Sequence, residues 1–203
     1  MDKTLEVPVY IVDDDQSVRE SLGYLLEGYD FKVYVFDNGD EFLKNTSVNG
    51  GPGCLILDSK MPGISGEEVH EKLNKIGSTF SVIFLTGHGD IPMAVTAFRN
   101  GANDFFQKPV SAAELITSIH KAQKKSIFLY QKYCNESLFD TLSEREKQLF
   151  FMVAEGRINK QISDKLCISL RTVEVHRAKM MEKLKAENIT DLVKLYDSLF
   201  SEQ

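Results

Sequence analysis

The sequence predicts an α/β doubly wound, five-stranded parallel sheet followed by an all-α domain. Over the first 110 residues, short apolar runs alternate five times with amphipathic segments, which is the strand–helix pattern of a doubly wound sandwich. Continuous apolarity in three of the runs indicates parallel strands that are covered on both faces. From about residue 111 the strand pattern ends, and every later segment fits a helix.

The individual elements follow from local patterns. Five runs are expected to form strands: Val9–Val12, Val33–Phe36, Cys54–Leu57, Val82–Leu85 and Asp104–Gln107. Helices are expected near residues 16–28, 39–45, 66–76 and 91–100. Ser65 with Glu68, and Ser111 with Glu114, fit the capping box, in which a hydroxyl and a carboxylate bind free backbone N–H groups at a helix start.

The chain is expected to divide into a domain at 1–120, a helical linker at 121–137 and a second domain at 138–203. The linker is predicted because apolar residues between Ile116 and Cys134 share one stripe at the helical period. A shorter helix followed by a flexible tether is the alternative.

The charge is distributed unevenly along the 203 residues, whose net charge is −6. Residues 1–120 carry 9 Lys/Arg and 18 Asp/Glu, whereas residues 121–203 carry 15 and 12. Only the second part is basic, as expected if that part alone approaches an anionic partner. No apolar stretch reaches the roughly 20 residues that span a bilayer, and the first residues lack the apolar run of a secretory signal.

The three cysteines, Cys54, Cys134 and Cys167, are widely spaced and match neither a zinc-site nor a CxxC spacing. Each thiol is expected to act as a small buried hydrophobic group. This cysteine usage favours a reduced, cytoplasmic setting.

Polar residues follow four of the predicted strands. Asp13 and Asp14 follow the first strand, Asp58 follows the third, Thr86 follows the fourth and Lys108 follows the fifth. Ligands of such sheets bind at the carboxyl ends of the strands, so these side chains are expected to converge. Three clustered carboxylates repel one another unless a hard cation neutralises them, and oxygen ligands favour Mg²⁺.

That arrangement suits phosphoryl transfer. Asp58 could attack a phosphoryl group as a carboxylate nucleophile, while the cation and Lys108 offset charge on the phosphoryl oxygens. Each element alone has a simpler explanation: a solvated turn with Asp15 as N-cap, a strand exit at Thr86, or a surface turn at Lys108. The agreement of four strand ends favours the phosphoryl pocket.

The second domain carries two helices around a sharp turn. A first helix is expected to open at Ser143, with Glu146 completing its capping box, and to end at Gly156. A short helix at 159–166 and a longer one at 172–184 follow, with Ser169 as N-cap. A second helix with cations on its outer face fits the major groove of DNA, although a small bundle with a solvated charged face is the alternative.

Residues on and near these two helices are candidates for contacts with DNA: Lys160, Arg171, Thr172, Val173, Glu174, His176, Arg177 and Lys179. Arg177 and Lys179 could read guanine edges or bind phosphates. Lys160 and Arg171 lie near helix starts and suit backbone phosphates better. Val173 also lies on the apolar side of its helix.

The motifs Val-Asp13-Asp14-Asp, Leu-Asp58-Ser-Lys-Met-Pro62-Gly63, Thr86-Gly-His-Gly-Asp90 and Lys108-Pro109 resemble, in order and spacing, the receiver domain of response regulators over about residues 7–120. The resemblance implies a flavodoxin-like fold in which a sensor histidine kinase phosphorylates Asp58. It also implies Mg²⁺ bound by Asp13, Asp14, Asp58 and the backbone carbonyl of Lys60.

The same resemblance implies that Thr86 and Phe105 form a switch pair and that Lys108 contacts the phosphoryl group. In such domains the Lys108–Pro109 bond is usually cis. Phosphorylation is expected to draw Thr86 toward the phosphate and let the Phe105 ring turn inward. Plain core packing is the alternative for Phe105, because Phe106 follows it and one of the two rings must face inward.

Leu142-Ser-x-Arg-Glu, Ala154-Glu-Gly, Asn159-Lys-Gln-Ile and Ser169-Leu-Arg-Thr-Val-Glu-Val-His-Arg resemble the LuxR-type helix-turn-helix, over about residues 138–197. The whole chain is therefore similar to the NarL/FixJ family of transcriptional regulators. Ile158 departs from that family, which usually has Ser or Thr there, so the helix N-cap is expected to be lost or shifted to Asn159. The final helix, near 188–199, forms the DNA-binding dimer contact in relatives, although packing within one domain explains its apolar residues nearly as well.

These features favour a phosphorylation-dependent transcriptional regulator rather than an enzyme, catalysing only its own phosphotransfer and dephosphorylation. The implied partners are a sensor histidine kinase, promoter DNA, RNA polymerase and a second copy of the chain, with no membrane partner. A hydrolase of the haloacid dehalogenase type would need a second aspartate where Lys60 stands. A small-molecule sensor with the same DNA-binding domain would not need the acidic triad or Lys108-Pro109.

Overall fold

In a computed structural model, the N-terminal part of the chain forms one parallel sheet. The structure describes residues 7–47, 50–87 and 91–200. The strands are β1 (Val9–Val12), β2 (Val33–Phe36), β3 (Cys54–Leu57), β4 (Ser81–Thr86) and β5 (Asp104–Gln107). All pairs are parallel and the order is β2-β1-β3-β4-β5, which confirms the predicted fold class. Only β4 departs from its predicted bounds, being one residue longer at each end.

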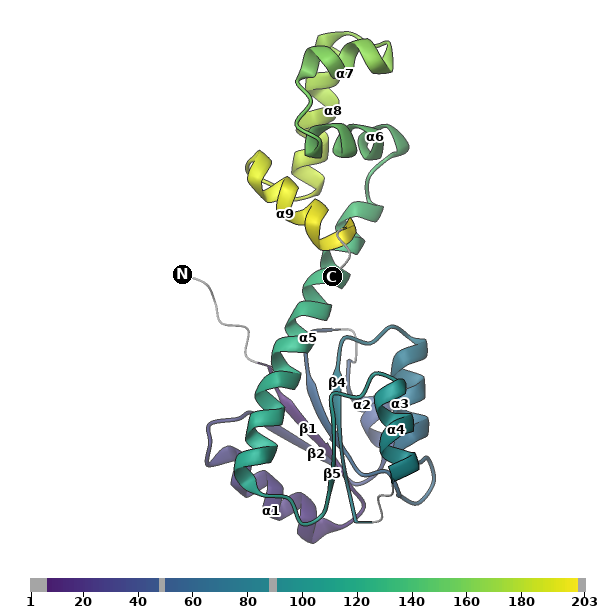
Figure 1. Cartoon of the computed structure of the whole chain (residues 1–203), viewed down its shortest axis with the longest axis vertical. Helices are drawn as coiled ribbons and strands as arrows, with labels where there is room; N and C mark the ends of the chain where they lie inside the picture. Colours follow the sequence, from purple (N-terminus) through teal and green to yellow (C-terminus); the bar gives the residue numbers. More distant parts are fainter. Residues whose placement is uncertain (1–6, 48–49, 88–90, 201–203) are drawn as a thin grey trace. The chain divides into compact units, whose positions relative to one another are not determined.

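Helices cover both faces of this sheet (Figure 1). They are α1 (Gln16–Glu27), α2 (Gly39–Asn45), α3 (Gly66–Lys75), α4 (Ile91–Arg99) and α5 (Ala112–Asp140). On one face, Leu26 of α1 and Ile119 of α5 pack into the same core as Ile83. On the other face, Phe42 of α2 and Val69 of α3 join a second core. The sheet is thus the middle layer of three, as continuous apolar strands require.

The helix α5 runs unbroken through the residues predicted as a linker. Its buried Ser126 hydroxyl donates to the carbonyl of Thr79 (2.6 Å) and accepts from the Gly53 N–H (2.8 Å), which precede β4 and β3. The contacts of α5 with the sheet therefore extend at least to Ser126. The chain divides into two compact units between Tyr130 and Gln131. The three-part division at residues 120 and 137 stays a prediction.

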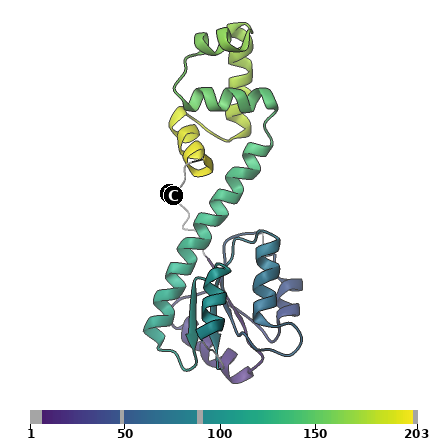
Figure 2. The ribbon, with the colours of Figure 1, turned by 45° about the vertical axis from the view of Figure 1, so that its right-hand side comes forward.

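The C-terminal unit is entirely helical in the part that the structure describes, as predicted. After the end of α5 come α6 (Glu144–Ala154), α7 (Asn159–Leu166), α8 (Leu170–Lys183) and α9 (Ile189–Phe200), coloured green to yellow in Figure 2. Phe150, Ile162, Met180 and Leu192 are fully buried and belong to one core. Four short helices can therefore share a single hydrophobic centre.

The helix starts test the capping predictions. Ser65 and Ser143 both form the expected capping boxes. Ser169 caps α8 as predicted, but the helix begins at Leu170, two residues earlier than expected. At α7 the cap position holds Ile158, whose side chain makes no capping bond, so the hydroxyl cap is lost and not shifted. The Gln161 side chain still accepts from the Ile158 N–H (3.1 Å).

The thiols differ in their surroundings. Cys54 is buried, Cys134 is half-buried and Cys167 is exposed, so the prediction of a buried hydrophobic group is wrong for Cys167. Burial raises the pKa of the Cys54 thiol well above its ordinary value. Among the described residues, no helix is both long enough and apolar enough to cross a membrane.

An ion pair between buried Glu146 and exposed Lys183 joins α6 to α8. Glu146 is 3% exposed and accepts from Lys183 Nζ (2.6 Å) and from the Ser143 N–H (2.8 Å). Burial alone would raise the pKa of Glu146, but the hydrogen bonds from Lys183 and Ser143 outweigh it and hold the pKa below its ordinary value. The carboxylate therefore stabilises the fold in its charged form.

Glu146→Gln is expected to lower the free energy of unfolding of the C-terminal unit by about 1–2 kcal/mol at neutral pH. Because the folded pKa is depressed, the stabilisation is complete above the unfolded pKa of about 4.3 and is lost as the pH falls through the folded value. Urea unfolding at pH 7 and at pH 3 to 4 measures this, and the difference from wild type should shrink in acid. Glu144→Gln, at an exposed residue of the same helical turn, is the control. A pH-independent difference would contradict the role of the charge.

Candidate functional site

The predicted acidic residues come together at the carboxyl edge of the sheet. Asp13 follows β1 and Asp58 follows its neighbour β3. One carboxylate oxygen from each of Asp13, Asp14 and Asp58 lies within 4.8 Å of the other two. Asp13 and Asp58 are buried, whereas Asp14 is exposed. An open cavity of about 480 Å³ lies against Asp14 and Asp58.

Lys108 reaches into the same cluster from the end of β5. Its Nζ donates to Asp13 Oδ2 (2.5 Å) and to Asp58 Oδ2 (2.9 Å). The Lys108–Pro109 bond is cis, as the resemblance implied. The ammonium thus lies between the two buried carboxylates and lines the cavity beside Asp58.

Burial is the largest influence on the pKa values of Asp13 and Lys108. Burial raises the pKa of Asp13, and hydrogen bonds from Lys108 and from the Asp15 N–H oppose that shift without reversing it. For Lys108, burial acts to lower the pKa, but the hydrogen bonds to Asp13 and Asp58 outweigh it and leave the pKa raised. Lys108 therefore does not fully offset the effect of burial on the Asp13 carboxylate.

The donor set fits a hard divalent cation. It consists of carboxylate oxygens from three residues, two of them buried, beside an open cavity through which an ion can enter. Oxygen ligands of this kind suit Mg²⁺. An added cation would also offset the cost of burying the charged form of Asp13 and its repulsion by Asp58.

Lys60 lies at the acidic cavity. Its N–H donates to Asp58 Oδ1 (3.2 Å), and its exposed side chain lines the cavity. The assignment of its carbonyl as a metal ligand stays a prediction. His88, Gly89 and Asp90 of the motif that begins at Thr86 lie outside the described residues.

The predicted switch residues lie on the α3–α4 face of the sheet. Thr86 is fully buried and is not among the described residues that line the cavity. Phe105 is half-buried, with its ring centroid 6.1 Å from that of Phe84. Phe106 packs on the opposite face, so β5 places one aromatic ring on each side.

Two residues at this site were not predicted. The Ser59 hydroxyl, next to the phosphoacceptor candidate, donates to Thr86 Oγ1 (2.7 Å). Gly66, the first residue of α3, lies so close that a Cβ there would be 2.1 Å from the Asp58 carbonyl oxygen. Both contacts depend on where α3 and β4 pack against the end of β3, and no local pattern in the sequence signals that.

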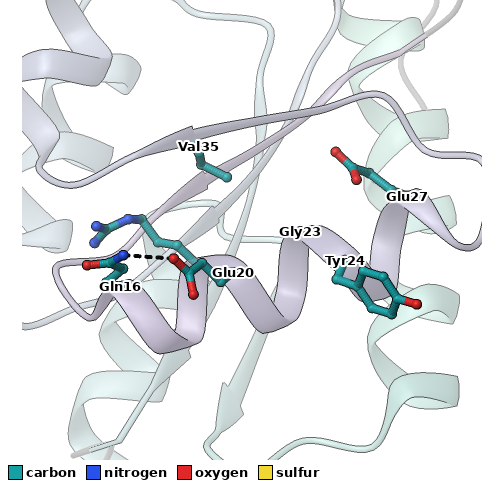
Figure 3. Close-up of a pocket in the computed structure, with 7 residues that line it drawn as sticks. Gln16, Glu20, Gly23, Tyr24, Glu27 and Val35 are labelled. Carbon is teal, nitrogen blue, oxygen red and sulfur yellow. Dashed lines mark hydrogen bonds between the residues drawn. The ribbon is translucent and has the colours of Figure 1, made fainter.

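A second groove, of about 440 Å³, lies between α1 and β2 (Figure 3). Gln16 donates to Glu20 (2.7 Å) along its rim, and Gly23 leaves a gap in the helix surface. Its lining is of mixed charge and holds no cluster of metal-ligating side chains among the described residues. The two cavities are similar in volume, so the lining distinguishes them, and only the acidic cavity has a cluster that could hold a cation among the described residues.

The second candidate surface is the exposed side of α8. Of the residues predicted to contact DNA, Arg171, Glu174 and Lys179 are exposed, as is Lys160 on α7. Thr172 and His176 are half-buried. The exposed residues recur at helical spacing and form one face.

Two of the residues predicted to contact DNA, Val173 and Arg177, face other parts of the C-terminal unit. Val173 is fully buried in the core, so its side chain does not face outward and the prediction of a DNA contact is wrong for it. Arg177 is half-buried and donates from Nη1 to Asn159 Oδ1 (2.9 Å), which joins α8 to the start of α7. Val175 (46% exposed) and Ala178 lie on the outer face instead and were not predicted.

The two parts of the chain define a class of protein. A parallel sheet with an acidic triad and a lysine at its carboxyl edge is a receiver domain, and the helices α7 and α8 form a helix-turn-helix. Residues 9–120 match the response regulator receiver domain, and residues 140–196 match the bacterial regulatory proteins of the luxR family. The chain belongs to the two-component response regulators of the NarL/FixJ family, and it is a transcription regulator, not a classical enzyme.

Similar proteins span nearly the whole chain. The tetrathionate response regulatory protein TtrR of Salmonella typhimurium is 37% identical over 193 residues, covering 95% of this chain and 93% of that protein. The transcriptional regulatory protein FixJ of Azorhizobium caulinodans is 39% identical over 193 residues, covering 93% and 91%. The solved structure of the response regulator StyR covers 95% of this chain and 98% of its own, with a TM-score of 0.72 at 38% identity.

Proposed function

We propose that Asp58 accepts a phosphoryl group from a sensor histidine kinase and that this phosphorylation controls DNA binding by the C-terminal domain. The observation that carries the proposal is the Lys108 ammonium between the carboxylates of Asp13 and Asp58, beside an open cavity. Asp58 lines that cavity, whereas buried Asp13 does not, so a donor entering from solvent meets Asp58 first. Asp58 acts as the nucleophile, and Lys108 offsets charge on the phosphoryl oxygens.

Mg²⁺ would be held by Asp13, Asp14, Asp58 and the carbonyl of Lys60. When bound, it supplies positive charge that draws phosphoryl oxygens and nucleophile together. Lys108 keeps a proton on Nζ for the phosphoryl oxygens, since its pKa is raised. After transfer, the Thr86 hydroxyl turns toward the phosphate and Phe105 packs inward beside Phe84.

Phosphorylation then favours a dimer. The helix α4 exposes Ile91 (81%), Val95 (43%) and Phe98 (50%) at helical spacing, next to the strand that carries Phe105. An apolar stripe of this kind suits burial against a second copy of the chain. Two copies on a two-fold axis would align two α8 helices with successive half-sites in DNA.

On DNA, the exposed face of α8 enters the major groove. Lys160 and Arg171 bind phosphates near helix starts, while Glu174, Val175 and Lys179 reach base edges or nearby phosphates. Thr172 and His176 contact DNA at the rim of the same face, and Arg177 holds α8 against Asn159. The DNA partner implies a cytoplasmic location and RNA polymerase as a further partner.

The test is gel filtration and promoter binding with and without beryllofluoride, which imitates the phosphoryl group. With Mg²⁺ and beryllofluoride the wild-type chain should elute as a dimer and bind a promoter fragment more tightly than the untreated chain. The same treatment of Asp58→Asn should have no effect. A wild-type chain that stays monomeric and binds DNA equally in both conditions would contradict the proposal.

Lys179→Ala is expected to weaken promoter binding about threefold to tenfold at moderate salt. If Lys179 binds a phosphate, the slope of log affinity against log salt concentration should fall by about 1. Gel-shift titrations at several salt concentrations measure both quantities. Lys72→Ala, at an exposed lysine of α3 in the N-terminal unit, is the matched control and should keep the wild-type slope. Wild-type affinity together with a wild-type slope in Lys179→Ala would remove Lys179 from the interface.

A further inference from the structure

A hydroxyl pair lies behind the acidic pocket. Ser59 follows Asp58 directly, and its Oγ donates to Thr86 Oγ1 at 2.7 Å. Ser59 is 1% exposed and Thr86 is 0% exposed, so water does not compete for this bond. Thr86 ends the neighbouring strand β4, which means the bond links the ends of two strands at the pocket.

The backbone on both sides of the bond is held in place. The Gly66 N–H donates to the Ser59 carbonyl (3.0 Å), and the Lys108 N–H donates to the Thr86 carbonyl (2.8 Å). The start of α3 also packs directly on the Ser59 backbone, since a Cβ on Gly66 would be 2.9 Å from Ser59 Cα. Ser59 therefore cannot follow Thr86 if the threonine side chain turns toward the cavity.

We propose that Ser59 is a positioning residue that holds the Thr86 hydroxyl in its unphosphorylated place and so sets how readily the receiver switches. The inference rests on the proposed function, in which Thr86 turns to bind the phosphoryl group on Asp58. The switching motion breaks the Ser59–Thr86 bond. It leaves the Ser59 hydroxyl in a site that excludes water.

The loss of that bond opposes switching. A buried hydroxyl without a partner is unfavourable, and Thr86 is the hydrogen-bond partner of the Ser59 hydroxyl in the part of the chain that the structure describes. An alanine at this position removes the bond from the resting state without leaving an unsatisfied group in the switched state. Ser59→Ala should therefore shift the equilibrium toward the switched state by about threefold to tenfold, the equivalent of one ordinary hydrogen bond.

The experiment is a titration of the full-length chain with beryllium at constant excess fluoride and Mg²⁺, followed by calorimetry and by the dimer fraction. Ser59→Ala should reach half-saturation at about threefold to tenfold lower concentration than the wild type. Ser59→Thr keeps the hydroxyl and should stay near the wild-type midpoint. A merely structural role for Ser59 would weaken or preserve ligand binding, so tighter binding is specific to the proposed role.

A double-mutant cycle identifies Thr86 as the partner. In a Thr86→Ser background, which keeps the hydroxyl, Ser59→Ala should still tighten binding. In a Thr86→Ala background it should have no effect on the calorimetric midpoint. Equal tightening in both backgrounds would overturn the assignment of Thr86 as the group that Ser59 holds.

The outcomes separate this inference from the proposed function. A wild-type chain that binds no beryllofluoride would refute the proposed function itself. A wild-type chain that responds, together with a Ser59→Ala variant that needs an equal or higher concentration, would refute only the role of Ser59. Circular dichroism and urea unfolding check that each variant folds. If Ser59→Ala does not fold, Ser59→Cys replaces the hydroxyl by a weak donor and should shift the midpoint in the same direction.

Discussion

An Asp58→Asn variant is expected to lose phosphate labelling by at least about a hundredfold, because an amide is a far weaker nucleophile than a carboxylate. The change also removes one negative charge from the proposed cation site. Folding should survive, since Lys108 keeps its bond to Asp13 and one carboxylate fewer repels the others. The loss would therefore report chemistry at Asp58 and not a collapse of the pocket.

The measurement is the rate of labelling by a small acyl phosphate in the presence of Mg²⁺. Asp30→Asn is the matched control, because it makes the same chemical change at an exposed residue that follows the far end of α1. Asp30 has a φ of 62°, a conformation that asparagine adopts readily, so the control should fold and label like the wild type. Undiminished labelling of Asp58→Asn would remove Asp58 from the role of acceptor.

The acidic site was predictable because its residues directly follow the ends of neighbouring strands. In a parallel sheet, the residue after each buried strand falls on one edge, so the positions of Asp13, Asp58 and Lys108 followed once the strands were located. Three of the strands were located from continuous apolar runs, which indicate burial on both faces of a parallel sheet. Local pattern was therefore enough to bring together residues that lie 95 positions apart in the chain.

The outer face of α8 was predicted less well, for a reason that lies in the helix period. Val173 and Val175 are both apolar, but they point about 200° apart around a helix, so only one can face the core. Val173 shares the buried side with Met180, seven residues on, and Val175 is left exposed. The helix period therefore placed Val173 correctly on the apolar side, and only its inclusion among the DNA contacts was wrong.

No local sequence pattern predicted the contacts between elements that meet only in the folded chain. Ser59 bonds to Thr86, which is 27 residues away, and Gly66 packs on the backbone of Asp58. Both contacts depend on the angle at which α3 leaves the end of β3. Neither the hydrophobic period nor the capping pattern determines the position of α3 to within an ångström. A glycine at the first position of the helix is only compatible with such a close approach.

Gly66→Ala is expected to destabilise the N-terminal unit by about 2–3 kcal/mol, because the new methyl would lie 2.1 Å from the Asp58 carbonyl oxygen. That atom is backbone and has no rotamer by which to move aside, so α3 or the end of β3 must shift. A shift of about an ångström at Asp58 should also slow labelling about tenfold to a hundredfold. Urea unfolding and the acyl phosphate assay measure the two effects.

Gly23→Ala, in the same unit, is expected to have the opposite effect on stability. Gly23 is a buried residue of α1, but a Cβ there would meet nothing within 4 Å, so alanine should stabilise the fold by about 0.5–1 kcal/mol through its better helix propensity. Both substitutions put the same methyl on a helical glycine, and only the space available differs. Opposite signs for the two variants would therefore establish that Gly66 is required by the close approach of α3 to the Asp58 backbone. If Gly66→Ala stabilised the fold as well, α3 could not lie as close to Asp58 as this geometry requires.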